Sequence, residues 1–144
     1  MARFDARLVT PAEWVGIGAG VVVLGVSFLP WYRTPDLPAF GTITAWDMGF
    51  MAWFPVLLLA GAGVLILLPH LGTPVRDLVP IWFGLSAIAV TSLVLRWVSG
   101  PGPLNGAGIF GEVGAVGFGF FTALVAAMAS GVAALGFRVF SRTT

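Results

Sequence analysis

The sequence predicts an all-α fold, an integral membrane four-helix bundle built from two helical hairpins. Hydrophobic residues make up 58% of the chain and charged residues only 9%, whereas a soluble domain carries about 25% charged residues. Four apolar stretches each approach the ~20 residues that a helix needs to cross a hydrocarbon layer about 30 Å thick. They occupy most of the 144 residues, so we expect a single transmembrane domain over residues 1–144.

The four helices are expected at about residues 12–30, 45–68, 78–97 and 109–138. The first start carries Thr10 as N-cap, a proline at the first helical position and Glu13 three residues after the cap, which is a capping-box pattern. Thr44 and Asp47 repeat this spacing before the second helix. We therefore expect both acids to have a structural role at a helix start.

Faces of small residues are predicted on the first and fourth helices. At ~100° per residue the small residues of the fourth helix fall on one face, and Phe120 and other large residues fall on the opposite one. Such faces let helices approach closely inside a membrane. They serve contacts within the bundle or docking against a helix of another protein. The predicted helix-docking residues are Gly16, Gly20, Gly111, Ala115, Gly119, Ala123, Ala126 and Ser130.

The six tryptophans lie near the expected helix ends, where indole rings prefer the membrane interface. Trp14 and Trp31 are separated by about 26 Å of helix at ~1.5 Å per residue, close to the thickness of the hydrocarbon core. On the outer side we expect an aromatic belt of Trp31, Tyr32, Trp46, Trp53 and Trp97.

The arginines predict the orientation, because cytoplasmic loops are enriched in basic residues. With the N-terminus inside, Arg33 and Arg96 lie outside and the other five lie inside: Arg3, Arg7, Arg76, Arg138 and Arg142. No cleavage site follows the first apolar run, so no signal peptide is expected. The lack of lysine beside many Ala, Gly, Val, Arg and Pro residues indicates a GC-rich genome. We therefore expect a multi-pass protein of the bacterial cytoplasmic (inner) membrane with both termini cytoplasmic.

Two charged residues lie at the outer ends of the last two expected helices. Arg96 ends the third helix and Glu112 begins the fourth, and each sign suits the local helix dipole. The pair is predicted to be a structural ion pair or, alternatively, a ligand, proton or partner site. His70 is the only histidine, and we expect it to be solvated at the cytoplasmic edge.

The composition argues against several kinds of chemistry. A net charge of +1 provides no basic stripe for nucleic acid. The absence of cysteine removes disulfides, thiolate metal sites and a cysteine nucleophile, and one histidine cannot form a typical zinc site. No nucleophile is expected beside an activating base. We therefore expect no catalytic, cofactor-binding or metal-binding residues, and no enzyme.

A short motif extends from Phe28 to Tyr32, reads Leu-Pro-Trp-Tyr at its end, and is followed by Thr44-Ala45-Trp46. It resembles a pattern found in small, mostly uncharacterised four-helix membrane proteins of actinobacteria. The resemblance covers the first helix, the first outer loop and the start of the second helix. It implies a bacterial inner membrane and small hydrophobic partners or a larger assembly, and it brings no catalytic residues.

Two functional hypotheses follow from the sequence. The first is an accessory, stabilising or assembly subunit of a larger bacterial membrane protein complex, with membrane lipids and other integral membrane subunits as partners. The alternative is a lipid- or small-molecule-binding membrane module or transport component. In that case the outer aromatic belt would form the site, and Arg33 or Arg96 would meet an anionic head group.

Overall fold

The computed structural model describes residues 8–33, 42–99 and 117–140 of the chain. These residues form four α-helices, a 3-10 helix (η2) and one antiparallel pair of two-residue strands (β1 and β2). The all-α, four-helix prediction is therefore confirmed for the described residues. The bounds are α1 Pro11–Val26, β1 Tyr32–Arg33, β2 Thr42–Ile43, η2 Ala45–Met48, α2 Phe50–His70, α3 Leu78–Ser99 and α4 Phe118–Phe140.

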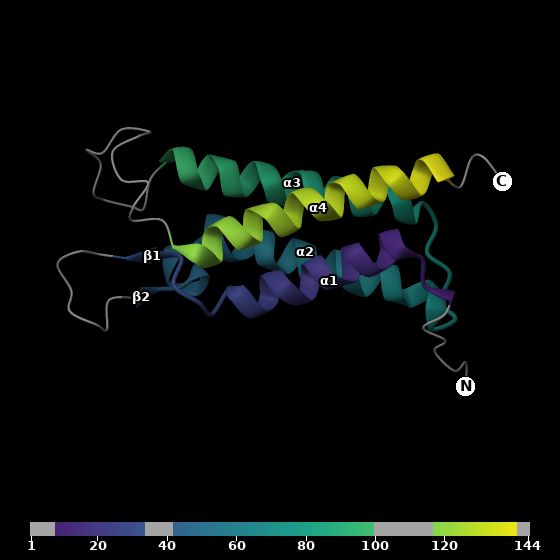
Figure 1. The fold of residues 1–144 in the computed structure, drawn as a ribbon, viewed down its shortest axis with the longest axis horizontal. Helices are drawn as coiled ribbons and strands as arrows, with labels where there is room; N and C mark the ends of the chain where they lie inside the picture. Colours follow the sequence, from purple (N-terminus) through teal and green to yellow (C-terminus); the bar gives the residue numbers. More distant parts are fainter. Residues whose placement is uncertain (1–7, 34–41, 100–116, 141–144) are drawn as a thin grey trace.

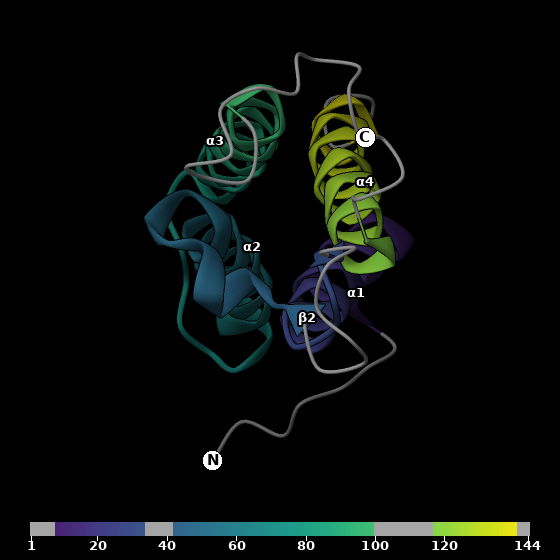
Figure 2. The same cartoon turned by 90° about the vertical axis from the view of Figure 1, so that its left-hand side faces the viewer.

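The four helices lie lengthwise beside one another (Figure 1) and form a ring when seen from the end (Figure 2). Helix α1 packs against α2 and α4, and α3 packs against the same two helices. Helices α1 and α3 therefore lie diagonally across the ring. Consecutive helices are antiparallel, so α1 and α3 begin at the same end. We call this the Glu13 end, and we call the other end, where α2 and α4 begin, the Trp31 end.

Helix α1 is shorter than predicted. Its start is the expected capping box, in which the Thr10 hydroxyl accepts from the backbone N–H of Glu13 and the Glu13 carboxylate accepts from the Thr10 N–H. The helix ends at Val26 after 16 residues, or about 24 Å. Hydrogen-bonded turns follow as far as Leu29. Pro30 cannot continue the helix, because it lacks an N–H donor. By length and composition three helices, α2, α3 and α4, are candidates to cross a membrane.

Helix α2 begins at Phe50 rather than at residue 45. The Thr44–Asp47 capping box is formed as predicted, but it starts the short helix η2. Gly49 then has a φ of +79°, a left-handed conformation that glycine adopts without penalty. This residue separates η2 from α2.

Helix α4 begins at Phe118, later than the predicted residue 109. Gly117 is not helical, and its N–H donates a hydrogen bond of 2.6 Å to the carbonyl oxygen of Trp31. Residues 109–116 of the predicted helix are not among the described residues. Gly111, Glu112 and Ala115 of the predictions lie outside the described residues. Helix α3, by contrast, agrees closely with the predicted range.

Most buried apolar residues that the structure describes form two clusters, one in each half of the bundle. The cluster of the Glu13 half is small and consists of Ala62, Ile66, Trp82 and Ala134. The cluster of the Trp31 half is larger and consists of Val23, Trp31, Ala45, Ala52, Val56, Leu59, Ala89, Leu93, Phe120, Ala123 and Ala127.

Candidate functional site

The helices carry many large apolar side chains on the outside, while several serines are buried inside with the apolar core. Val21 is 68% exposed and Val132 69% exposed, whereas Ser86 and Ser130 are completely buried. A soluble bundle instead exposes mainly polar and charged residues. The hydroxyls of Thr91 and Thr122 donate to the carbonyl oxygens four residues earlier in their own helices, so neither requires water as an acceptor.

The small faces predicted for helix docking are used inside the bundle. A Cβ atom on Gly20 would lie 2.7 Å from the carbonyl oxygen of Leu59 on α2, and one on Gly119 would lie 2.6 Å from Cδ1 of Trp31. Gly16 is equally close to side chains of α2 and α3. Ala123 and Ser130 are buried and Ala126 is half-buried. These residues therefore make contacts within the bundle.

A second set of helical glycines has open space where a Cβ atom would be: Gly18, Gly25, Gly61, Gly84 and Gly136. Gly18 and Gly25 are seven residues apart on α1 and so share a face. Val15 and Val22, both exposed, lie on the same face. We call these four residues the outer face of α1. It points away from the face that contains Gly16 and Gly20.

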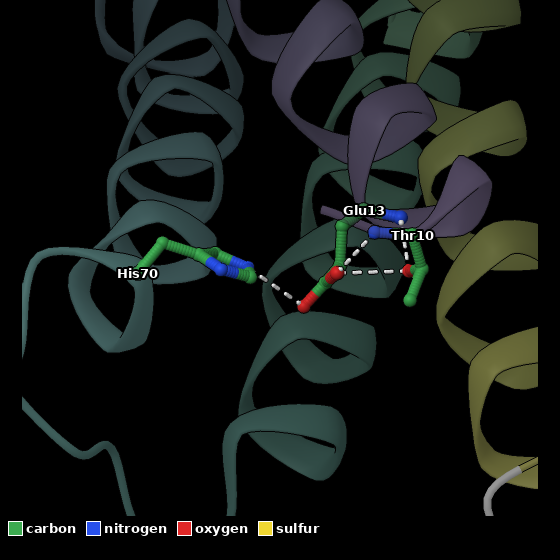
Figure 3. A network of polar contacts seen from close by, with 3 residues as sticks. All are labelled: Thr10, Glu13 and His70. Carbon is green, nitrogen blue, oxygen red and sulfur yellow. Dashed lines mark hydrogen bonds and ion pairs between the residues drawn. The ribbon is translucent and has the colours of Figure 1, made fainter. Parts of the chain in front are cut away.

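The Glu13 end contains a polar cluster that joins α1 to α2 (Figure 3). Oε2 of Glu13 accepts hydrogen bonds from the backbone N–H and the hydroxyl of Thr10, at 2.7 and 2.8 Å. Oε1 of Glu13 lies 3.2 Å from Nε2 of His70, the last residue of α2. Glu13 is 5% exposed and the His70 side chain 14%. One carboxylate therefore caps α1 and contacts the end of α2.

The expectation that His70 is solvated was wrong. Consecutive antiparallel helices place the end of α2 beside the start of α1, and the capping box leaves one carboxylate oxygen of Glu13 free to accept a further donor. The sequence contained both signals, a cap acid and a histidine at the same expected end of the bundle. They become a contact only when the helices that carry them are known to be neighbours.

A buried hydroxyl and indole cluster joins α3 to α4. The Nε1–H of Trp82 donates to Oγ of Ser130 at 2.9 Å, and Oγ of Ser86 lies 3.0 Å from the same atom. All three side chains are completely buried. Trp82 was expected at the membrane interface with the other tryptophans, but it lies inside because Gly16 of α1 leaves room for its ring.

Members of the predicted outer aromatic belt occupy different environments. Trp31 is completely buried, donates from Nε1 to the carbonyl oxygen of Val26 and packs edge-on against Phe120. Trp46 and Trp97 are each 39% exposed, and Trp53 is half-buried. The side chain of Tyr32 lies outside what the structure describes. Trp31 is thus part of the core.

Arg96 lies in the last turn of α3 at the Trp31 end. Its side chain is half-buried, and its Nε atom is buried without a hydrogen-bond partner. No ion pair joins it to another described residue. Glu112, the expected partner, lies outside the described ranges, so the ion pair remains a prediction.

Asp47 has a purely local role at the Trp31 end. The hydroxyl and the backbone N–H of Thr44 donate to its carboxylate at 2.7 and 3.0 Å, and these bonds lower the pKa of Asp47. The side chain is exposed, so the bonds hold η2 without contacting another helix.

Within residues 8–33, 42–99 and 117–140, no group of three or more His, Asp or Glu side chains is placed to hold a metal ion. The polar clusters at the Glu13 end and between α3 and α4 instead contact neighbouring helices. Comparison with protein family models, curated proteins and solved structures found no match to this chain.

Proposed function

We propose that this chain is an accessory, stabilising or assembly subunit of a larger bacterial membrane protein complex, without chemistry of its own. The observation that carries the proposal is the outer face of α1, which presents Gly18 and Gly25 where the bundle itself makes no use of them. The proposed occupant of this face is a transmembrane helix of another subunit.

The proposed membrane location is supported by the apolar outer surface of the bundle. Large apolar residues cover the outside of all four helices, and three of these helices are long enough to cross a membrane. Lipid favours such a surface, whereas water does not. The arginine distribution supports placing the Glu13 end at the cytoplasm.

The proposed partner helix is supported by the helix stability that is lost at Gly18 and Gly25, the two glycines with open space on the outer face of α1. A glycine in a helix is destabilising by roughly 1 kcal/mol relative to alanine, and Gly18 and Gly25 gain no close packing in return. In a membrane, glycines on a shared helix face allow another backbone to approach. Val15 and Val22 on the same face would supply van der Waals contacts.

The proposal is tested by purifying the tagged chain from its native membrane in mild detergent and measuring its stoichiometric partners by mass spectrometry. We expect one integral membrane protein in constant ratio, and we expect the variant Gly18→Leu/Gly25→Leu to lose it. The substituted side chains meet open space, so circular dichroism should show an unchanged helix content.

Gly136→Leu is the matched control, because Gly136 is an open glycine on α4, and we expect this variant to keep the partner. A chain without any stoichiometric partner in several mild detergents would contradict the subunit role. A partner that survives the double substitution on α1 would contradict this face as its binding site.

A further inference from the structure

Arg96 lies on the inward-facing side of α3 rather than on its outer surface. Trp82, Ser86, Ala89 and Leu93 are all completely buried, and their spacing of four, three and four residues defines one helix face. Arg96 follows Leu93 by three residues and so belongs to the same face. Its half-buried side chain therefore starts from the inner side of α3, at the Trp31 end.

The charge of this arginine is not compensated by the acids that the structure describes. Glu13 is bound to Thr10 and His70 at the opposite end. Asp47 accepts from Thr44, and Asp77 lies beside Arg76. Buried polar groups nearly always have a partner, yet the Nε atom of Arg96 has none.

We propose that Arg96 binds the phosphate of an anionic phospholipid at the Trp31 end of the bundle. The guanidinium is a planar fork of N–H donors that matches a phosphate with two parallel hydrogen bonds, and the two terminal nitrogens of the Arg96 side chain can present such a pair. Residue 96 is in the last turn of α3, at the level of the lipid head groups if α3 spans the membrane. This inference uses the proposed membrane location but requires no protein partner.

Exposed aromatic residues on the same end suit this ligand. Trp97 follows Arg96 and is 39% exposed, as is Trp46 on η2. Indole rings at the interface pack beside acyl chains near the head groups. The dipole of α3 favours a cation at its C-terminus, which suits an arginine in the last turn.

The test measures lipid binding to the purified, delipidated full-length chain by native mass spectrometry and by thermal unfolding. Three additives are compared at equal concentration: phosphatidylglycerol, uncharged diacylglycerol and inorganic phosphate. We expect saturable binding and a rise in Tm with phosphatidylglycerol alone. Equal stabilisation by inorganic phosphate, or by diacylglycerol, would overturn the assignment to an anionic lipid.

The decisive variant is Arg96→Gln, for which we expect phosphatidylglycerol to bind at least about tenfold more weakly, as the loss of a charge-assisted hydrogen bond implies. Arg96→Lys keeps the charge without the fork and should give an intermediate affinity. Arg76→Gln is the control, because Arg76 is an exposed loop arginine, and it should bind as the unaltered chain does. Unchanged binding by Arg96→Gln would overturn the proposal.

Glu112 is the competing partner, and a double-mutant cycle separates it from lipid. If Glu112 alone neutralises Arg96, then Arg96→Gln and Glu112→Gln lower Tm equally and non-additively in delipidated protein, with no effect on lipid binding, and the proposal fails. If Arg96→Gln does not fold, the proposal is tested by lipid titrations of the unaltered chain and of Arg96→Lys. The lysine variant should then bind phosphatidylglycerol more weakly than the unaltered chain, and equal binding would overturn the proposal. Loss of lipid specificity with an intact protein partner would remove this inference and leave the subunit role standing.

Discussion

The same capping-box pattern occurs near both ends of the bundle, but only one copy links two helices. At the Glu13 end the acid is buried and reaches His70 on α2. At the Trp31 end Asp47 is exposed and its carboxylate accepts hydrogen bonds from Thr44. A local motif therefore determines how a helix starts, whereas its role in tertiary structure depends on whether a neighbouring helix supplies a donor.

The two halves of the bundle also differ in what joins their helices. In the Glu13 half, side-chain hydrogen bonds connect α1 to α2 and α3 to α4. In the Trp31 half, the hydrogen bonds between segments involve connecting residues, such as Gly117 to Trp31 and Trp46 to Ser27, around a larger apolar cluster. We infer that directional bonds hold one half and close packing holds the other.

Trp31→Ala is expected to have the largest effect, because it removes the ring that packs against Phe120 and Gly119 in the Trp31 half. Replacing a fully buried tryptophan by alanine costs about 3–5 kcal/mol. The measurement is the free energy of unfolding in SDS titrations, followed by circular dichroism. Trp97→Ala, at an exposed tryptophan, is the control and should cost much less. Equal losses for the two variants would mean that Trp31 does not anchor its half.

Glu13→Gln is expected to have an intermediate effect, about 1–3 kcal/mol, because the charge that faces His70 is lost while an amide oxygen can still accept from Thr10. Asp47→Asn is the matched control, since it also replaces a carboxylate by an amide, in an exposed capping box that contacts no histidine. Its effect on the free energy of unfolding should be smaller. In a double-mutant cycle with His70→Ala, the Glu13→Gln effect should largely disappear. Additive effects would show that the Glu13–His70 contact contributes no stability.

Local features of the fold were predictable from the sequence. Four apolar stretches predicted four helices, and the Thr10 and Thr44 patterns predicted the two boxes that are formed. The ends of helices were harder to predict, because apolar composition continues past Val26, where α1 ends, and begins before Gly49, which separates η2 from α2. Hydropathy reports burial or lipid exposure, but it contains no information on a single φ angle.

The contacts between helices were the least predictable part. Gly16, Gly20 and Gly119 were expected on small faces, and the sequence alone left open whether those faces meet helices of this bundle or of another protein. The structure places all three inside. Trp31 and Trp82 were expected at the interface because tryptophan prefers it, but facing glycines make room for both rings in the core. Such complementarity depends on residues far apart in the chain.

Ser130→Ala is expected to have the smallest effect of the three substitutions, although it removes the acceptor of Trp82 and the partner of Ser86 at once. Interhelical hydrogen bonds in membranes contribute about 0.6 kcal/mol on average and at most about 1.7, because the separated helices also find partners. The control is Thr122→Ala on the same helix, whose hydroxyl bonds only its own backbone. Unfolding in SDS should show a loss for Ser130→Ala that exceeds the loss for the control. If the two losses are equal, the Glu13 half is held by packing just as the Trp31 half is, and the distinction between the halves fails.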